Sequence, residues 1–423
     1  MNVGTSQIDI TPDVGGELSG FALRLQPSVG VLDRLQARGL YLAAGTSRLL
    51  WIHCDLIGFD AGVVAAFREW AQRELGLTAA QVMLSATHTH SGPGTLRLVE
   101  VGAYDERYSG FLHARLQQAA HLANGRTEPC TLVATEGRLE LAVHRRNPAS
   151  AHPDPRVGAV GFQRADGTFS AVIANHPIHP VALGDENRLI SADLFGSAAA
   201  ELSRQLPGRP VVLLTNGACG NLNPPVTGVA PGQVEAWGRM IAQAVAPGLQ
   251  TAPASLAPTL RTATARFTLT LDVLDRTGIE ACTTAILSGA AGSNPEWQKK
   301  LRRAVDHWRR MRTAAVDAGR QPDHREIELF AVGLGDVVLV GADVELFSDF
   351  TDWVRRDSGI QVYTIGYANG AWGYLPTRAA YAEGGYEVES AHYFYGDFRF
   401  KAGGLEKLAT ETSAWLRRAF ARP

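Results

Sequence analysis

The stretch VMLSATHTHSGPG, residues 82–94, runs from a short apolar segment into two histidines and a Gly-Pro-Gly loop. A run of this length bounded by turn residues is typical of a buried strand. Because alternate residues of an extended chain share a face, we expect His88 and His90 to point the same way. Two imidazoles at a strand end suit a metal ligand beside a general base or a second ligand. The stretch therefore indicates a metal site at a strand-to-loop junction.

Similar apolar runs recur along the chain and alternate with segments of helical spacing. We expect strands at 48–52, 82–86, 171–174, 210–214 and 337–340. We expect helices at 62–75, 108–124, 195–205, 234–246, 298–318 and 405–420. This alternation predicts an α/β fold, a layered domain in which a mixed β-sheet has helices on both faces and the metal lies among loops at strand ends.

Residues 248–266 are rich in Ala, Thr and Pro, and this change of composition marks a possible junction between two lobes. The alternating run RFTLTLDVLD that follows, residues 266–275, predicts an exposed or edge strand. The strongly basic segment 298–320 is more typical of the solvated face of an amphipathic helix than of a nucleic-acid contact.

Composition and charge exclude several classes of partner. The 40 basic and 42 acidic residues leave a formal charge of -2, so no global field attracts nucleic acid or anionic lipid. No apolar run reaches the ~20 residues that a membrane-spanning helix needs. The first residues show no secretory signal, so we expect a cytoplasmic protein. The partner that remains is a small neutral molecule, and no oligomeric state is indicated.

The four cysteines are far apart and form no CxxC pair, which argues against a thiolate zinc site and a disulfide framework. Cys54 and Cys219 lie among apolar or small neighbours and are interpreted as packing residues. Asp55 ends an apolar run and could orient a ligand histidine or hold a second metal.

A second histidine cluster, NHPIHPVALG at residues 175–184, again follows an apolar run and leads to the segment NRLISAD, which ends at Asp193. Within it His179 is a stronger candidate than His176. Two histidine clusters at strand ends, with no cysteine alternative, favour a histidine-based zinc site. A third junction, VVLLTNGACGNLNPP at residues 211–225, places small residues where main-chain amides could line a pocket.

In this order the three segments resemble the neutral/alkaline ceramidase family, whose opening segment is similar to IDITPDVGGELSGF at residues 8–21. The resemblance extends over nearly the whole chain and implies one zinc ion per chain. It implies His88 and His179 as zinc ligands. It implies Glu345, in VVLVGADVELF, and Tyr374, in GAWGYLPT, as the other two.

The resemblance also implies residues that act on the substrate. It implies His90 beside the reacting carbonyl as a proton shuttle, Arg146 in HRRNP near the carbonyl oxygen, and Tyr386 in GGYEVES as a further active-site group. One segment departs from the family, because Asn221 and Asn223 in GNLNP replace its Asp and Ser. A covalent serine mechanism is therefore excluded there, and Asn223 is expected to hydrogen-bond the substrate.

The implied activity is hydrolysis of a carbon–nitrogen amide bond by zinc-activated water. Typical members of the family carry a secretory signal and a β-rich C-terminal domain. We see neither, so we expect residues 1–423 to form a single catalytic domain that acts on a small soluble N-acyl or cyclic amide. Two alternatives stay open: a zinc esterase or lactonase, and a catalytically silent homologue that binds a metal or another ligand.

Overall fold

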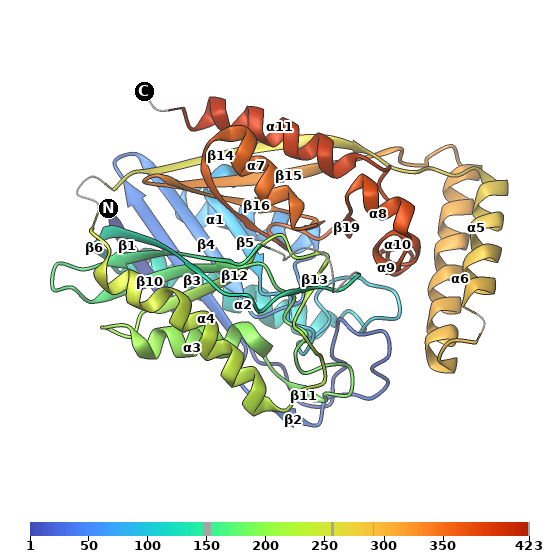
Figure 1. The fold of residues 1–423 in the computed structure, drawn as a ribbon, viewed down its shortest axis with the longest axis horizontal. Coiled ribbons are helices and arrows are strands. Elements are labelled where there is room, and N and C mark those ends of the chain that lie inside the picture. Colours follow the sequence, from blue (N-terminus) through green and yellow to red (C-terminus); the bar gives the residue numbers. More distant parts are fainter. Residues whose placement is uncertain (147–153, 255–257, 291, 422–423) are drawn as a thin grey trace.

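The computed structural model describes residues 1–146, 154–254, 258–290 and 292–421 (Figure 1). Its strands form three larger sheets. The first has the order β5-β4-β3-β1-β6, with β5 (Val82–Ala86), β4 (Ser47–Cys54), β3 (Gln36–Ala44), β1 (Asn2–Asp9) and β6 (Thr127–Pro129). The second is β12 (Val211–Asn216), β10 (Phe169–His176), β9 (Arg156–Gln163) and β7 (Thr131–Arg138). The third is β14 (Leu260–Thr270), β15 (His324–Leu334), β16 (Val337–Ala342) and β18 (Gln361–Ile365).

Each sheet combines antiparallel strands with one parallel pair. The parallel pairs are β4 with β5, β10 with β12, and β16 with β18. Because parallel strands end at the same edge of a sheet, each pair delivers two loops to one place. The three larger sheets are therefore mixed, as the sequence predicts, and each has one edge suited to a site.

The sheets share a core in which they pack on one another. Leu49 and Trp51 of β4 belong to this shared core, whereas Leu50 and Ile52 belong to the core beneath the helices. This division follows from the alternation of side chains along a strand. The α/β class is confirmed. The sequence predicted one mixed sheet, whereas the structure has three larger ones. Helices cover only the outer face of each sheet, because the inner faces pack on one another.

The longer helices lie outside the shared core, most of them against the sheets and α5 and α6 beside them (Figure 1). They are α1 (Ala61–Leu75), α2 (Glu106–Gly125), α3 (Asp193–Gln205), α4 (Pro231–Thr251), α5 (Arg276–Gly289), α6 (Pro295–Asp317), α7 (Asp349–Ser358) and α11 (Gly404–Ala419). In Figure 1, α7 and α11 lie over the third sheet, and α5 and α6 form an antiparallel pair at the right-hand end. Within the described ranges no helix has both the length and the apolar character needed to cross a bilayer.

Short elements complete the structure. They are η1 (Ala79–Gln81), β2 (Gly30–Val31), β8 (Val143–His144), β11 (Leu189–Ile190), β13 (Leu222–Asn223), β17 (Glu345–Leu346), β19 (Tyr374–Leu375), α8 (Arg378–Glu383), α9 (Tyr386–Glu389) and α10 (Ala391–Tyr395). The two-residue strands pair as β2 with β11, β8 with β13 and β17 with β19, and several of the short elements carry the residues of the candidate site.

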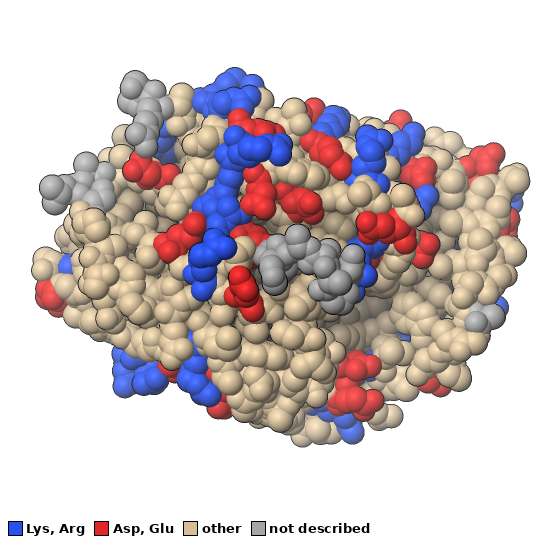
Figure 2. All heavy atoms as spheres, viewed as in Figure 1, with Lys and Arg blue, Asp and Glu red and all other residues tan. Residues whose placement is uncertain are grey.

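The expected strands and helices are all present, with ends shifted by a few residues. The alternating run forms part of β14, which lies at the end of its sheet, so the edge strand is confirmed. The segment 248–266 leads from α4 into this third sheet, although residues 255–257 lie outside the described ranges. Basic side chains of α6 form ion pairs, Arg303 with Glu100 and Arg309 with Glu280. Basic and acidic side chains are interspersed on the face drawn in Figure 2.

Asp55 has a different partner from the one considered above. Its carboxylate is fully buried and accepts hydrogen bonds from Arg38 Nη1 at 2.8 Å and from the Gln36 main chain at 2.9 Å. It hydrogen-bonds no ligand histidine among the described residues. Asp55 therefore neutralises a buried guanidinium and joins β3 to the end of β4.

Replacing Arg38 by Met should destabilise the fold by about 3–5 kcal/mol, because it leaves a buried carboxylate without its partner. The matched control is Arg34→Met, since the Arg34–Asp9 pair is exposed, with side-chain exposures of 72% and 41%. Its loss should cost about 0–1 kcal/mol. Urea unfolding of both variants measures the difference, and equal effects would contradict the assigned role of the buried pair.

Candidate metal centre

The parallel strands of all three sheets end close together, and the loops that follow them meet at one buried point. The loop after β5 carries His88 and His90, the loop after β10 carries His179, and β17, which follows β16, carries Glu345. Donor atoms of His88, His90 and His179 all lie within 4.8 Å of one another. Side chains more than 250 residues apart in sequence thus come together because three sheets share one edge region.

His88 is held by two main-chain carbonyl groups. Its N–H donates to Leu56 O at 2.8 Å and its Nδ1 donates to Ile57 O at 2.6 Å. The residue lies beyond the end of β5, with a left-handed φ of 65°. The His88 and His90 rings lie beside one another, with centroids 4.8 Å apart, and the left-handed loop beyond β5, not strand alternation, brings them together. The Nδ1 bond leaves the Nε2 lone pair of His88 free for a metal ion.

His179 is fixed in the same manner. Its Nδ1 donates to Cys219 O at 2.7 Å, which in the neutral imidazole places the lone pair on Nε2. His176, three residues earlier, lies within hydrogen-bond distance of Arg156 O and is outside the cluster. The preference for His179 over His176 agrees with these positions.

Glu345 brings a carboxylate to the two imidazoles. Its Oε2 lies 3.6 Å from His88 Nε2 and 3.4 Å from His179 Nε2. Two tyrosine hydroxyls donate to this carboxylate, Tyr395 to Oε1 and Tyr367 to Oε2. The negative charge is therefore buried but solvated by hydrogen-bond donors, which is the condition for keeping a carboxylate ionised away from water.

His90 is the least restrained imidazole of the three. Its Nε2 lies 3.2 Å from His88 Nε2, and no described residue forms a hydrogen bond with its buried Nδ1. Its ring packs against Phe21 and Gly20, the end of the segment 8–21, and a Cβ at Gly20 would lie 2.3 Å from His90 Cγ. The opening segment of the chain thus forms the wall behind His90.

The donor set fits a zinc ion. Zn–N bonds of about 2.0–2.1 Å place two ligands of a tetrahedral ion about 3.3 Å apart. The separations of 3.2, 3.4 and 3.6 Å among His88, His90, His179 and Glu345 match that edge. Neutral imidazoles with Nδ1 bonded to carbonyl groups, beside a carboxylate, form the nitrogen and oxygen set that zinc prefers. His88, His179 and Glu345 would hold the ion, and His90 is close enough to be a further ligand.

The cluster lies at one side of a cavity of about 300 Å³. Tyr374, Tyr386 and Asn223 also line it. The Tyr374 ring lies against the Arg145 guanidinium and the Tyr386 ring, at 5.0 and 5.9 Å. Burial raises the pKa of Tyr374 well above its ordinary value, although the neighbouring Arg145 opposes this. Tyr374, which the family resemblance implies as a zinc ligand, thus lines the same cavity as Tyr386 and Asn223, which it implies as groups that act on the substrate.

Arg145, and not Arg146, lies at the cavity. Arg145 Nε donates to Glu387 at 2.6 Å, and among the described residues its buried Nη2 has no hydrogen-bond partner. Arg146 points away and binds Glu387 Oε2 at 2.7 Å and the carbonyl groups of Ala380 and Gly384. The two arginines are adjacent in HRRNP, so a sequence match could not decide which one faces the cavity.

Asn221 and Asn223 have different surroundings. The Asn221 side chain exchanges hydrogen bonds with Ser348 at 3.1 and 2.9 Å, and the main-chain carbonyl of Asn221 accepts the main-chain N–H of Arg145. Asn223, on β13, lines the cavity, and its buried Oδ1 has no hydrogen-bond partner within the part of the chain that the structure describes. Asn221 is therefore structural, and Asn223 is available to a ligand.

The segment ending at Asp193 joins the two histidine loops. Thr89 Oγ1 donates to Ser191 O at 2.7 Å, and the Ser191 N–H donates to Ser91 O at 2.9 Å. The Asp193 carboxylate accepts the main-chain N–H groups of Ala182 and Leu183, both at 3.1 Å. The segment NRLISAD therefore fixes the two histidine loops relative to each other.

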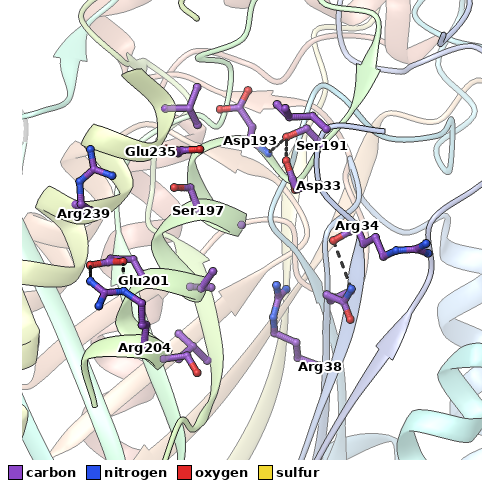
Figure 3. Close-up of a pocket in the computed structure, with 18 of the residues that line it drawn as sticks. Asp33, Arg34, Arg38, Ser191, Asp193, Ser197, Glu201, Arg204, Glu235 and Arg239 are labelled. Carbon is purple, nitrogen blue, oxygen red and sulfur yellow. Dashed lines mark hydrogen bonds and ion pairs between the residues drawn. The ribbon is translucent and has the colours of Figure 1, made fainter. Parts of the chain in front are cut away.

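A larger cavity, of about 560 Å³, lies on the other side of this segment (Figure 3). Asp33 there accepts hydrogen bonds from Ser191 Oγ and from the Ala192 N–H, and burial raises its pKa to about 6. Arg38 pairs with Asp55, and Arg204 pairs with Glu201. The cavity contains none of the clustered histidines. The lining residue Asp33 supports Ser191, which in turn contacts the first histidine loop.

Three comparisons with known proteins agree with this arrangement. The family described as neutral/alkaline non-lysosomal ceramidase, N-terminal, matches residues 1–230. The neutral ceramidase of Pseudomonas aeruginosa is 26% identical over 246 residues, covering 52% of this chain and 36% of that protein. Neutral ceramidase B of Dictyostelium discoideum is 24% identical over 230 residues, covering 49% and 32%. The chain thus aligns with about a third of each of these relatives.

The crystal structure of neutral ceramidase from Pseudomonas aeruginosa superposes with a TM-score of 0.71 at 22% identity, covering 99% of this chain and 74% of that one. A structure of ceramidase complexed with C2 gives the same TM-score and identity. The fold is therefore shared along the whole chain. The family match covers the two histidine loops, and Glu345, Tyr374 and Tyr386 lie beyond it.

Proposed function

This chain belongs to the neutral/alkaline non-lysosomal ceramidase family, and from that premise we propose that it is a zinc-dependent hydrolase of a small N-acyl or cyclic amide. The observation that carries the proposal is the convergence of His88 Nε2, His179 Nε2 and Glu345 Oε2 at a cavity. Tyr374 completes the proposed ligand set. A zinc ion there would supply a Lewis acid for the substrate carbonyl and would activate water.

Arg145 is suited to the carbonyl oxygen. Its guanidinium is held by Glu387, and its unpartnered Nη2 is buried at the cavity. A fixed donor that gains a partner only as negative charge develops on the substrate stabilises the transition state more than the ground state. Arg145 therefore takes the role that the family resemblance suggested for Arg146.

His90 is suited to proton transfer. Unlike His88 and His179, its ring donates to no main-chain carbonyl, and it lines the cavity beside the proposed ligands. A base in this position can take a proton from the attacking water and return it to the leaving amine. Asn223 Oδ1, which lacks a partner, can accept the N–H of the substrate amide.

The cavity favours a short acyl group. Its volume of about 300 Å³ is at the lower end of the ~300–1,000 Å³ typical of small-molecule sites. Leu23, Leu98, Trp297 and Phe394 give it an apolar side. The Tyr386 ring lies near Trp297 and Phe394 and is 39% exposed, which fits a position at the entrance. These features support an apolar acyl portion of limited length.

Hydrolysis of matched substrates tests this function. We expect the zinc-loaded protein to cleave N-acetyl and N-hexanoyl p-nitroanilide, and to cleave a long-chain ceramide much more slowly. A chelator should abolish turnover and added zinc should restore it. Cleavage of the corresponding p-nitrophenyl esters alone would favour the esterase alternative. No turnover of any substrate by a zinc-loaded protein would favour the silent homologue.

The role of His90 can be tested through Gly20. Gly20→Ala would push a methyl group into the His90 ring, whereas a methyl group at Gly15 would meet no atom within 4 Å. The two glycines have nearly the same φ, 107° for Gly20 and 106° for Gly15. Both variants carry similar backbone strain, so Gly15→Ala is the matched control. We expect Gly20→Ala to keep its zinc and to lower kcat by about 100-fold or more, as loss of a general acid–base does.

Gly15→Ala should change kcat by less than about threefold, because the added methyl group meets no other atom. Steady-state kinetics and metal analysis of both variants provide the measurement. Loss of zinc from Gly20→Ala would assign His90 to the ligand set, and an unchanged kcat would remove it from the mechanism.

A further inference from the structure

Tyr367, which no sequence motif indicated, lies against the metal-binding residues. It follows β18 in a left-handed conformation with a φ of 58°, and its carbonyl accepts the N–H of Ala86 at 3.2 Å. The loop with His88 leaves β5 at that same residue, and His88 is left-handed too. Left-handed residues other than glycine are unfavourable, so two of them in contact suggest a functional constraint.

The Tyr367 side chain contacts three of the proposed donor residues at once. Its ring stacks on the His88 imidazole, with centroids 3.7 Å apart and planes inclined by 6°. Its hydroxyl lies 3.0 Å from Glu345 Oε2 and 3.3 Å from His179 Nε2. The side chain is almost fully buried, at 1% exposure. No other tyrosine among the described residues makes a hydrogen bond or ring contact with all three.

We propose that Tyr367 is a positioning residue of the metal centre. This inference rests on the proposed function. The stacked ring prevents rotation of the His88 imidazole, which already donates from Nδ1 to Ile57. The hydroxyl holds Glu345 Oε2, while Tyr395 holds Oε1. Ligands oriented before the ion binds lose less freedom on binding, so both contacts increase metal affinity.

The two contacts can be removed separately. Tyr367→Phe keeps the ring and removes the hydroxyl, and Tyr367→Leu removes both. Tyr363→Phe is the matched control, because Tyr363 is buried on β18 and its hydroxyl donates to a carboxylate, Glu136, at 2.6 Å, away from the cluster. Competition with a zinc-binding dye measures zinc affinity, and thermal unfolding of the metal-free proteins measures stability.

We expect zinc affinity to fall about tenfold in Tyr367→Phe and about 100-fold in Tyr367→Leu, which is the range for loss of groups that orient metal ligands. Tyr363→Phe should stay within about twofold of the wild type. Wild-type affinity in both Tyr367 variants would overturn the proposal and leave the proposed function intact. An equal loss in Tyr363→Phe would also overturn it. A wild-type protein that binds no zinc would overturn the proposed function and this inference together.

Discussion

The rest of the site depends on two hydrogen bonds, in which His88 and His179 each donate from Nδ1 to a main-chain carbonyl. These bonds select the tautomer whose Nε2 lone pair faces the partner imidazole and Glu345. The acceptors, Ile57 O and Cys219 O, belong to loops that follow β4 and β12. In the first and second sheets, one strand of the parallel pair supplies the histidine loop and the other supplies the carbonyl that orients it.

The third sheet closes the centre. Its parallel pair, β16 and β18, brings Glu345 and Tyr367 to the two imidazoles. Because the three sheets also share a core on their inner faces, the relative position of these loops is fixed by packing over the whole chain. The cavity beside the centre is lined by three residues with a buried polar atom that has no hydrogen-bond partner in the described part of the chain: His90 Nδ1, Arg145 Nη2 and Asn223 Oδ1. Buried polar groups without partners are costly, so their presence at a cavity wall is best explained by a ligand that satisfies them.

Local patterns predicted part of this arrangement and could not predict the rest. Apolar runs ending in histidines identified the strands that lead to His88 and His179, because a buried strand and the polar loop after it are both recognisable within about ten consecutive residues. Polar or glycine-rich strands such as β1 and β9 were missed, since their burial depends on neighbours distant in sequence. Which of the adjacent Arg145 and Arg146 faces the cavity depends on the local path of the chain, which a sequence match does not reveal. Tyr367 contacts His88 only because the third sheet lies beside the first.

Metal content of the purified protein, by elemental analysis, tests the central claim most directly. Wild type should hold about one zinc per chain, and His88→Ala and His179→Ala should hold none. His176→Ala, a change to a buried histidine at the end of the same strand β10 but outside the cluster, should keep the metal. Absence of zinc from the wild type, or its retention in all three variants, would contradict the account.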